Sequence, residues 1–196
     1  MGRPAALILA GGRAERLGGA EKPLLSLGKR TVLDRILIAI AGEISAVALS
    51  ANGDPARFAS YSLPVLPDGR FSGQGPLAGL LAGLEWAAAL GAADLLSIPG
   101  DTPFLPSGLA ARLAPAPSVA ASGGRAHYLV ALWPLTARVA LTERLTAPGP
   151  RSVAGFAAEI GSRIVEFPAE ATHELFFNIN TPADLARARA MVAAGA

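Results

Sequence analysis

Short apolar runs alternate with longer segments of helical period along this chain, and that alternation limits the folds that it can adopt. The apolar runs have four to six residues and end near Gly, Pro, Asn or Asp, which is typical of buried strands. We predict strands over residues 5–10, 46–51, 63–66, 93–98 and 128–133.

The intervening segments have the apolar spacing of helices, and we predict helices over residues 31–41, 76–90, 106–113 and 135–145. Pro76 and Pro106 stand where a first helical turn tolerates proline, and Thr181-Pro182 opens a last helix with Thr181 as its cap. Alternating strands and helices predict an α/β fold with a mostly parallel sheet covered on both faces, which binds ligands at the carboxyl ends of its strands. A chain of 196 residues favours one domain spanning residues 1–196.

Composition excludes several classes of function. The formal net charge is only +2 and the basic residues are scattered, so we expect no nucleic-acid partner. The chain has no cysteine, which excludes disulfides, thiolate nucleophiles and zinc–thiolate sites. Its longest apolar region, residues 76–97, is interrupted by Glu85 and Asp94, so we expect no membrane span and a cytoplasmic protein.

The first predicted strand runs directly into Gly11-Gly12. Glycines let the backbone approach a ligand closely and turn its N–H groups toward an anion. Arg13, Arg16 and Lys22 add positive charge nearby, so a phosphate-binding loop is one interpretation. A glycine-rich turn with solvated arginines is the alternative, and the spacing is that of neither a P-loop nor a dinucleotide fingerprint.

A second signal is the segment SIPGDTPFLP, residues 97–106, in which an apolar strand ends and Asp101 follows. One carboxylate at this sheet edge suits Mg²⁺, which takes one or two carboxylates and otherwise prefers phosphate oxygens and water. The alternative is that Asp101 only caps a turn before Pro103.

Weaker signals follow other predicted strands. Asn52 and Asp68 come after two of them, and the helical segment GQGPLAGLLAGL begins at Gly73. Each alone is more often a turn residue, but all would lie at one edge of one sheet. His127 and His173 have no partner at metal-ligand spacing, so we interpret them as structural or exposed histidines.

Four motifs together resemble a known family. The segments LAGGRAERLGGAEKPLL, GPLAGLLAGL, PGDTPFLP and FNINTPADL occur in the order and spacing of the molybdenum cofactor guanylyltransferases. This family is a branch of the nucleotidyltransferases with a Rossmann-like, three-layer αβα fold. The resemblance implies transfer of GMP from GTP to the terminal phosphate of molybdopterin, with release of pyrophosphate.

The resemblance also implies roles for residues. The GTP-binding residues would be Leu9, Ala10, Gly11, Gly12, Lys22, Asn52, Asp68 and Asp101. Lys22, Asp101 and Arg16 would be catalytic, because the reaction brings two anions together and needs charge neutralisation and alignment. Asp101 would also hold Mg²⁺, and Asn178 and Asn180 would lie on the molybdopterin side.

The chain departs from the family at Glu21, where Asp usually precedes the lysine. Two alternatives to guanylyl transfer remain at this stage: a cytidylyltransferase acting on the same cofactor, and a non-catalytic nucleotide-binding adaptor. A sugar-phosphate enzyme is disfavoured because it usually needs a longer chain. Family analogy further implies transient contact with molybdenum-insertion enzymes and with the enzymes that receive the cofactor.

Overall fold

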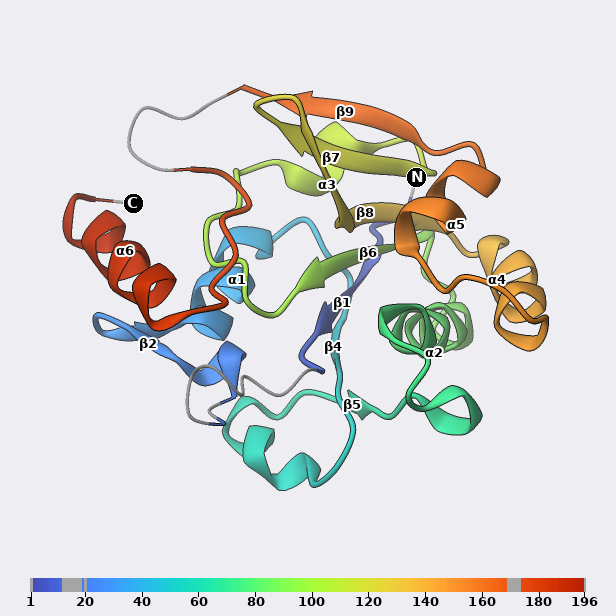
Figure 1. Ribbon diagram of the computed structural model, residues 1–196, viewed down its shortest axis with the longest axis horizontal. Coiled ribbons are helices and arrows are strands. Elements are labelled where there is room, and N and C mark those ends of the chain that lie inside the picture. Colours follow the sequence, from blue (N-terminus) through green and yellow to red (C-terminus); the bar gives the residue numbers. More distant parts are fainter. Residues whose placement is uncertain (1, 12–18, 20, 169–173, 196) are drawn as a thin grey trace.

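Seven strands of the described residues form one sheet in the order β5-β4-β1-β6-β8-β7-β9 (Figure 1). The computed structural model describes residues 2–11, 19, 21–168 and 174–195. The strands are β1 (Ala5–Leu9), β4 (Val47–Ser50), β5 (Val65–Leu66), β6 (Asp94–Pro99), β7 (Ser118–Ser122), β8 (Arg125–Pro134) and β9 (Arg163–Phe167). A separate hairpin consists of β2 (Ser26–Leu27) and β3 (Arg30–Thr31).

The sheet is mostly parallel, as predicted. Strands β5, β4, β1 and β6 all run in one direction, and β7 is parallel to β9. Strand β8 runs antiparallel to both β6 and β7. Because β8 is reversed, its first residues reach the same sheet edge as the carboxyl ends of β1, β4 and β6.

Helices cover both faces of the sheet (Figure 1). The α1 (Val32–Ile40), α3 (Leu109–Leu113) and α6 (Pro182–Ala193) helices lie on one side, and α2 (Pro76–Ala89), α4 (Ala137–Thr146) and α5 (Val153–Glu159) lie on the other. Short 3₁₀ helices are η2 (Lys22–Leu24), η3 (Pro55–Tyr61) and η4 (Gly69–Phe71). Within the described ranges, no helix combines the length and apolarity needed to cross a membrane.

Strand β1 shows why its sequence is apolar throughout. Ala6 and Ile8 pack into the core cluster with α1 and α3, whereas Ala5 and Leu7 pack into the cluster with α2, α4 and α5. Successive side chains of a strand point to opposite faces, so a strand covered on both sides needs an unbroken apolar run. The apolar run of β1 ends at Leu9, so Gly11 follows at the carboxyl end of the strand.

The five predicted strands and the predicted helices are present, with shifted ends. One helix start was wrong: α3 begins at Leu109, after Gly108 in the left-handed region at φ 70°, and not at Pro106. The pattern also missed β7, β9 and α5: β7 is rich in small residues, and β9 is largely exposed. Thr181 and Asp184 form the predicted cap of α6, as a reciprocal capping box.

Candidate active site

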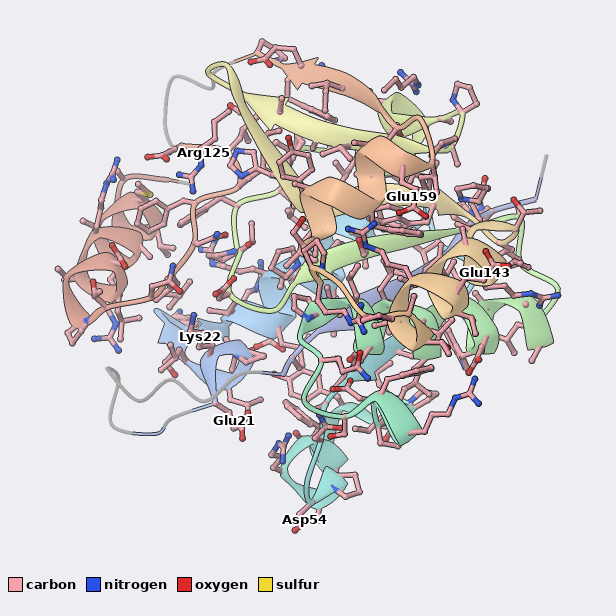
Figure 2. All side chains as sticks on the ribbon, turned by 45° about the vertical axis from the view of Figure 1, so that its right-hand side comes forward. Glu21, Lys22, Asp54, Arg125, Glu143 and Glu159 are labelled. Carbon is pink, nitrogen blue, oxygen red and sulfur yellow. The ribbon has the colours of Figure 1, made fainter. Side chains whose placement is uncertain are left out.

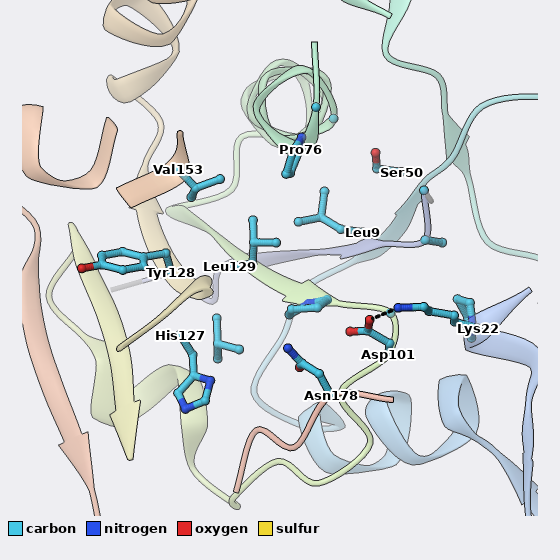
Figure 3. Close-up of a pocket in the computed structure, with 18 of the residues that line it drawn as sticks. Leu9, Lys22, Ser50, Pro76, Asp101, His127, Tyr128, Leu129, Val153 and Asn178 are labelled. Atoms are coloured by element: carbon cyan, nitrogen blue, oxygen red, sulfur yellow. Dashed lines mark hydrogen bonds and ion pairs between the residues drawn. The ribbon is translucent and has the colours of Figure 1, made fainter. Parts of the chain in front are cut away.

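A cavity of about 840 Å³ opens at the carboxyl edge of the parallel strands (Figure 3). Residues Leu9, Ala10 and Gly11 enter it from the end of β1, Asn52 from the loop after β4, and Asp101 from the loop after β6. The parallel direction of these strands brings their following loops together, as the sequence predicted.

Asn52 and Asp68 meet at one end of the cavity. Asn52 donates from Nδ2 to Asp68 Oδ2 at 2.7 Å and accepts at Oδ1 from the Asp68 backbone N–H at 3.0 Å. The two hydrogen bonds fix both side chains relative to each other. They leave polar groups for a ligand at fixed positions, which is the arrangement a specific binding site needs.

Gly79, in the second turn of α2, lines the same end of the cavity. A Cβ at this position would lie 2.2 Å from Ser50 Oγ and 3.2 Å from Asp68 Oδ1. No side chain fits there without displacing these groups. Glycine therefore lets helix α2 approach the end of β4 closely.

Gly100 allows a similarly close approach next to the end of β1. Its N–H donates to the Leu9 carbonyl at 2.9 Å, and a Cβ here would lie 2.8 Å from Pro23 Cγ and 3.0 Å from the Leu9 oxygen. The buried Pro23 thus packs directly against the turn that carries Asp101. This packing brings the neighbouring Lys22 beside Asp101 in the lining of the cavity.

The Lys22 ammonium joins two segments that are distant in sequence. Its Nζ atom lies 2.7 Å from Asp101 Oδ2 and donates to Asn180 Oδ1 at 2.5 Å (Figure 3 shows the first contact). Both the Lys22 and the Asp101 side chains are mostly buried. An ammonium has three N–H donors, so this one keeps a donor for an anionic ligand.

The segment before α6 lies beside the loop that follows β6. The Ile179 N–H donates to the Asp101 carbonyl at 3.0 Å, and Thr102 Oγ1 donates to Asn178 Oδ1 at 2.7 Å. Thr102 is fully buried, so this hydrogen bond satisfies a hydroxyl that water cannot reach. Asn178 itself lines the cavity.

The first half of β8 forms another wall of the cavity. The sequence predicted the strand from residue 128 but not that it lines the site. Arg125, His127 and Tyr128 line the cavity there, as do Ser152 and Val153 at the start of α5 (Figure 3). Burial lowers the pKa of His127, and the positive charge of Arg125 lowers it further, so the imidazole is neutral at pH 7. Its ring lies 4.9 Å, between centroids, from that of the buried Phe176, which belongs to the segment before α6.

Asp101 is the side chain that fits a magnesium ion. Oδ2 contacts Lys22, and Oδ1 lies 3.4 Å from Thr102 Oγ1, which leaves it capacity for another ligand. The described residues hold no group of three or more His, Cys, Asp and Glu side chains that could enclose a metal by themselves. A single carboxylate is nevertheless a fitting donor set for Mg²⁺ when phosphate oxygens and water complete the coordination.

Most of the predicted site residues come together. Those that line the cavity are Leu9, Ala10, Gly11, Lys22, Asn52, Asp68, Asp101 and Asn178. Asn180 joins them through its hydrogen bond to Lys22. Gly12, Arg13, Arg16 and His173 lie outside the described residues, so their predicted positions stay predictions.

Residues 6–160 match the family described as MobA-like NTP transferase domain. A protein of Acidiphilium cryptum named molybdenum cofactor guanylyltransferase is 60% identical over 185 residues, which are 94% of this chain and 93% of that protein. A protein of the same name from Rhodopseudomonas palustris strain HaA2 is 47% identical over 197 residues, covering 96% and 92%.

The chain belongs to the molybdenum cofactor guanylyltransferase family. This confirms the resemblance carried by the four sequence motifs.

Solved structures agree in fold with this family assignment. A molybdopterin-guanine dinucleotide biosynthesis protein A from Archaeoglobus fulgidus has a TM-score of 0.70 at 20% identity, covering 96% of this chain and 98% of that one. A 2-C-methyl-D-erythritol 4-phosphate cytidylyltransferase from Thermus thermophilus has a TM-score of 0.64 at 20% identity, covering 97% and 99%. At such identities the similarity shows the nucleotidyltransferase fold and no more.

Proposed function

We propose that this protein transfers GMP from GTP to the terminal phosphate of molybdopterin and releases pyrophosphate. The observation that carries the proposal is the position of Lys22, which lines the cavity and whose ammonium contacts Asp101 after β6 and Asn180 before α6. A cation between two polar walls suits a reaction in which two phosphate groups must approach each other. We place the reaction in the cytoplasm.

The nucleotide would occupy the end of the cavity near β1 and β4. Its guanine and ribose would lie against the backbone at Leu9–Gly11 and the fixed pair of Asn52 and Asp68. Its phosphates would extend to Lys22, whose remaining N–H donor is available to them. Gly79 lets α2 pack closely on Ser50 and Asp68 at this end of the cavity, which shapes the surface that the nucleotide would contact.

Mg²⁺ would be held by Asp101 together with phosphate oxygens, and when bound it would reduce the negative charge on the triphosphate. The side chains of the protein bind the reactants and align them. Lys22 neutralises phosphate charge, and Asp101 orients Lys22 through the ion pair at 2.7 Å. Arg16, which lies outside the described residues, would add a second cation if the predicted role is correct.

The acceptor would occupy the other part of the cavity, between β8 and the segment carrying Asn178 and Asn180. Besides Lys22, Arg125 is a cationic side chain among the described lining residues. It forms no ion pair with another described residue. An oxygen of the acceptor phosphate would attack the α-phosphorus of GTP. The bond from that phosphorus to the oxygen bridging to the β-phosphate would break, and pyrophosphate would leave with its electron pair.

The two alternatives are less well supported. The relatives at 60% and 47% identity are both named guanylyltransferases, which disfavours the cytidylyl reaction. A non-catalytic adaptor would be expected to lose Lys22 or Asp101 first, because these side chains serve the transition state more than the fold. Both are present and in contact. Transient contacts with molybdenum-insertion and cofactor-receiving enzymes are part of the same proposal.

Nucleotide binding tests the proposal directly. We expect calorimetry with Mg²⁺ to show preference for GTP over CTP, ATP and UTP, and Lys22→Ala to weaken GTP binding by roughly ten-fold or more, as loss of a charge-assisted hydrogen bond does. Asp101→Asn should abolish guanylyl transfer to molybdopterin while GTP binding stays measurable. Preference for CTP, or full turnover by Asp101→Asn, would contradict the guanylyl and the metal assignments respectively.

A further inference from the structure

Arg57, in the η3 helix, makes three contacts that converge on the candidate active site from outside the cavity. Its Nη2 atom donates to the Asn52 carbonyl at 2.6 Å, and Nη1 donates to the Asp54 carbonyl at 3.2 Å. Its Nε atom is buried and makes no hydrogen bond within the described residues, but it lies 3.1 Å from Glu21 Oε1, so the two side chains form an ion pair. The guanidinium thus connects two backbone carbonyls of one loop to a carboxylate of another segment.

Each end of this connection lies next to a residue of the site. Glu21 immediately precedes Lys22, and Figure 2 shows the two side chains leaving the chain in different directions, with Asp54 on the side of Glu21. Asn52 provides the carbonyl that accepts from Arg57, while its side chain engages Asp68 through two hydrogen bonds. Neither Glu21 nor Arg57 is among the residues that line the cavity.

Among the described residues, Arg57 is the side chain that the Glu21 carboxylate contacts in an ion pair. Glu21 occupies the N-cap position of η2, but its side chain makes no capping hydrogen bond. The two loops joined by Arg57 follow different strands, β1 and β4, and no strand hydrogen bonds extend to residues 21 and 52. The ion pair between Glu21 and Arg57 is therefore a side-chain connection between the phosphate end and the base end of the cavity.

Arginine suits this connection better than lysine. A planar guanidinium can offer its N–H groups in several fixed directions, whereas a lysine ammonium acts as a compact point charge. Gly53 lets the loop close around it: its φ is 85°, and a Cβ there would lie 3.1 Å from Arg57 Nη1. The backbone of residues 52–54 thus encloses the guanidinium.

We infer that Arg57 is a positioning residue, which through Glu21 holds Lys22 in register with the Asn52 loop, so that contacts to the nucleotide base and to its phosphates form together. This inference rests on the proposed function, because it assigns the base to Asn52 and the phosphates to Lys22. It also explains what the glutamate at position 21 does, since its side chain spans the distance to Arg57.

The test is a double-mutant cycle read by GTP calorimetry with Mg²⁺, which needs no acceptor and no turnover. In the wild-type background, Glu21→Gln and Arg57→Gln should each weaken GTP binding by roughly five- to ten-fold, a size typical of pairwise coupling between residues in one network. In the Lys22→Ala background, Glu21→Gln should change GTP affinity by less than about two-fold, because Glu21 acts through Lys22. Arg57→Lys should recover only part of the loss.

Glu159→Gln is the matched control. It removes a carboxylate from another ion pair with an arginine, Arg144, that does not line the cavity. GTP affinity should be unchanged in this variant, and the melting temperatures of all the Gln variants should stay close to that of the wild type.

Two results would overturn the inference: equal weakening by Glu21→Gln with and without Lys22, which indicates general loosening, or no weakening in the wild-type background. Failure of the proposed function would look different, since the wild-type protein would then prefer another nucleotide. The same cycle would in that case be measured with the preferred nucleotide. The effect of Glu21→Gln on affinity would again be compared between the wild-type and Lys22→Ala backgrounds.

Discussion

Two glycines of α2 determine how closely this helix packs on the sheet, and one of them lines the cavity. Gly79 allows α2 to approach Ser50 and Asp68, and Gly83, one turn later, allows the same helix to approach Leu7 of β1. Glycine inside a helix costs about 1 kcal/mol relative to alanine. The close approach requires it in spite of that cost.

Gly79→Ala should therefore weaken GTP binding and also lower the free energy of unfolding. The new Cβ would overlap Ser50 Oγ, and overpacking of this kind costs about 1–3 kcal/mol, which exceeds the gain in helix propensity. Urea unfolding and GTP calorimetry measure the two effects. Adding Ser50→Gly, which removes the overlapping atoms, should restore part of the stability.

Gly83→Ala is the control for this prediction. Its Cβ would lie 2.5 Å from Leu7 Cδ2, inside the core and away from the cavity-lining residues. It should lower stability and leave the GTP affinity of the folded protein unchanged. Equal GTP affinity in Gly79→Ala and Gly83→Ala would contradict the role given to Gly79.

At the scale of elements, the amino terminus of α6 holds the segment that carries Asn178 and Asn180. Asp184 Oδ2 accepts from the backbone N–H groups of Asn180 at 3.0 Å and Thr181 at 2.9 Å. These hydrogen bonds, that from Asn180 foremost, lower the pKa of Asp184. The helix cap therefore also orients a contact of Lys22.

The lowered pKa predicts how the stabilisation depends on pH. When the folded pKa lies below the unfolded value, ordinarily about 3.9 for Asp, the unfolded state binds more protons in between. The contribution of the Asp184 carboxylate is then present above the unfolded pKa and is lost as the pH falls through the folded one. Urea unfolding at pH 7 should show Asp184→Asn less stable than the wild type, with the difference shrinking by pH 3.

Thr181→Ala separates charge from capping. It removes the hydroxyl that accepts from the Asp184 N–H, a neutral hydrogen bond worth about 1 kcal/mol. It also removes a smaller effect of the Thr181 side chain on the pKa of Asp184, and only that part depends on pH. Its destabilisation should persist at pH 3. An Asp184→Asn difference that is equally large at both pH values would refute the electrostatic explanation.

For the whole molecule, the sheet ties its two helical layers into one body. Strand β1 contributes alternate residues to both core clusters, so loss of either helical layer exposes apolar side chains of this central strand. The expectation that residues 1–196 form one domain stays a prediction, with a direct test. Both tryptophans, Trp86 and Trp133, lie in the cluster with α2 and α4.

We expect urea unfolding to be a single cooperative transition. Tryptophan fluorescence reports on one helical layer, whereas far-ultraviolet circular dichroism reports on helices of both, and the two midpoints should coincide. Separate midpoints would mean that the layers unfold independently and that the one-domain prediction is wrong.

The sequence could predict the site residues that follow parallel strands, but not those at the start of the reversed strand β8. Leu9, Asn52 and Asp101 follow apolar runs, and parallel strands bring such positions to one edge, so their meeting could be expected. Arg125 and Tyr128 reach that edge because β8 runs the other way, and an apolar run has the same pattern in either direction. Long-range side-chain pairs such as that of Glu21 and Arg57 have no periodic signal at all.

The two contacts of Lys22 also differ in when they can form during translation. Asp101 follows Lys22 by 79 residues, but Asn180 follows it by 158. Strands β1, β4, β5 and β6 all precede Asp101, so a growing chain contains Leu9, Asn52 and Asp101 long before Asn180 leaves the ribosome. A premature stop between α5 and Asn180 would thus yield a chain that contains these cavity-lining residues but has lost one partner of Lys22.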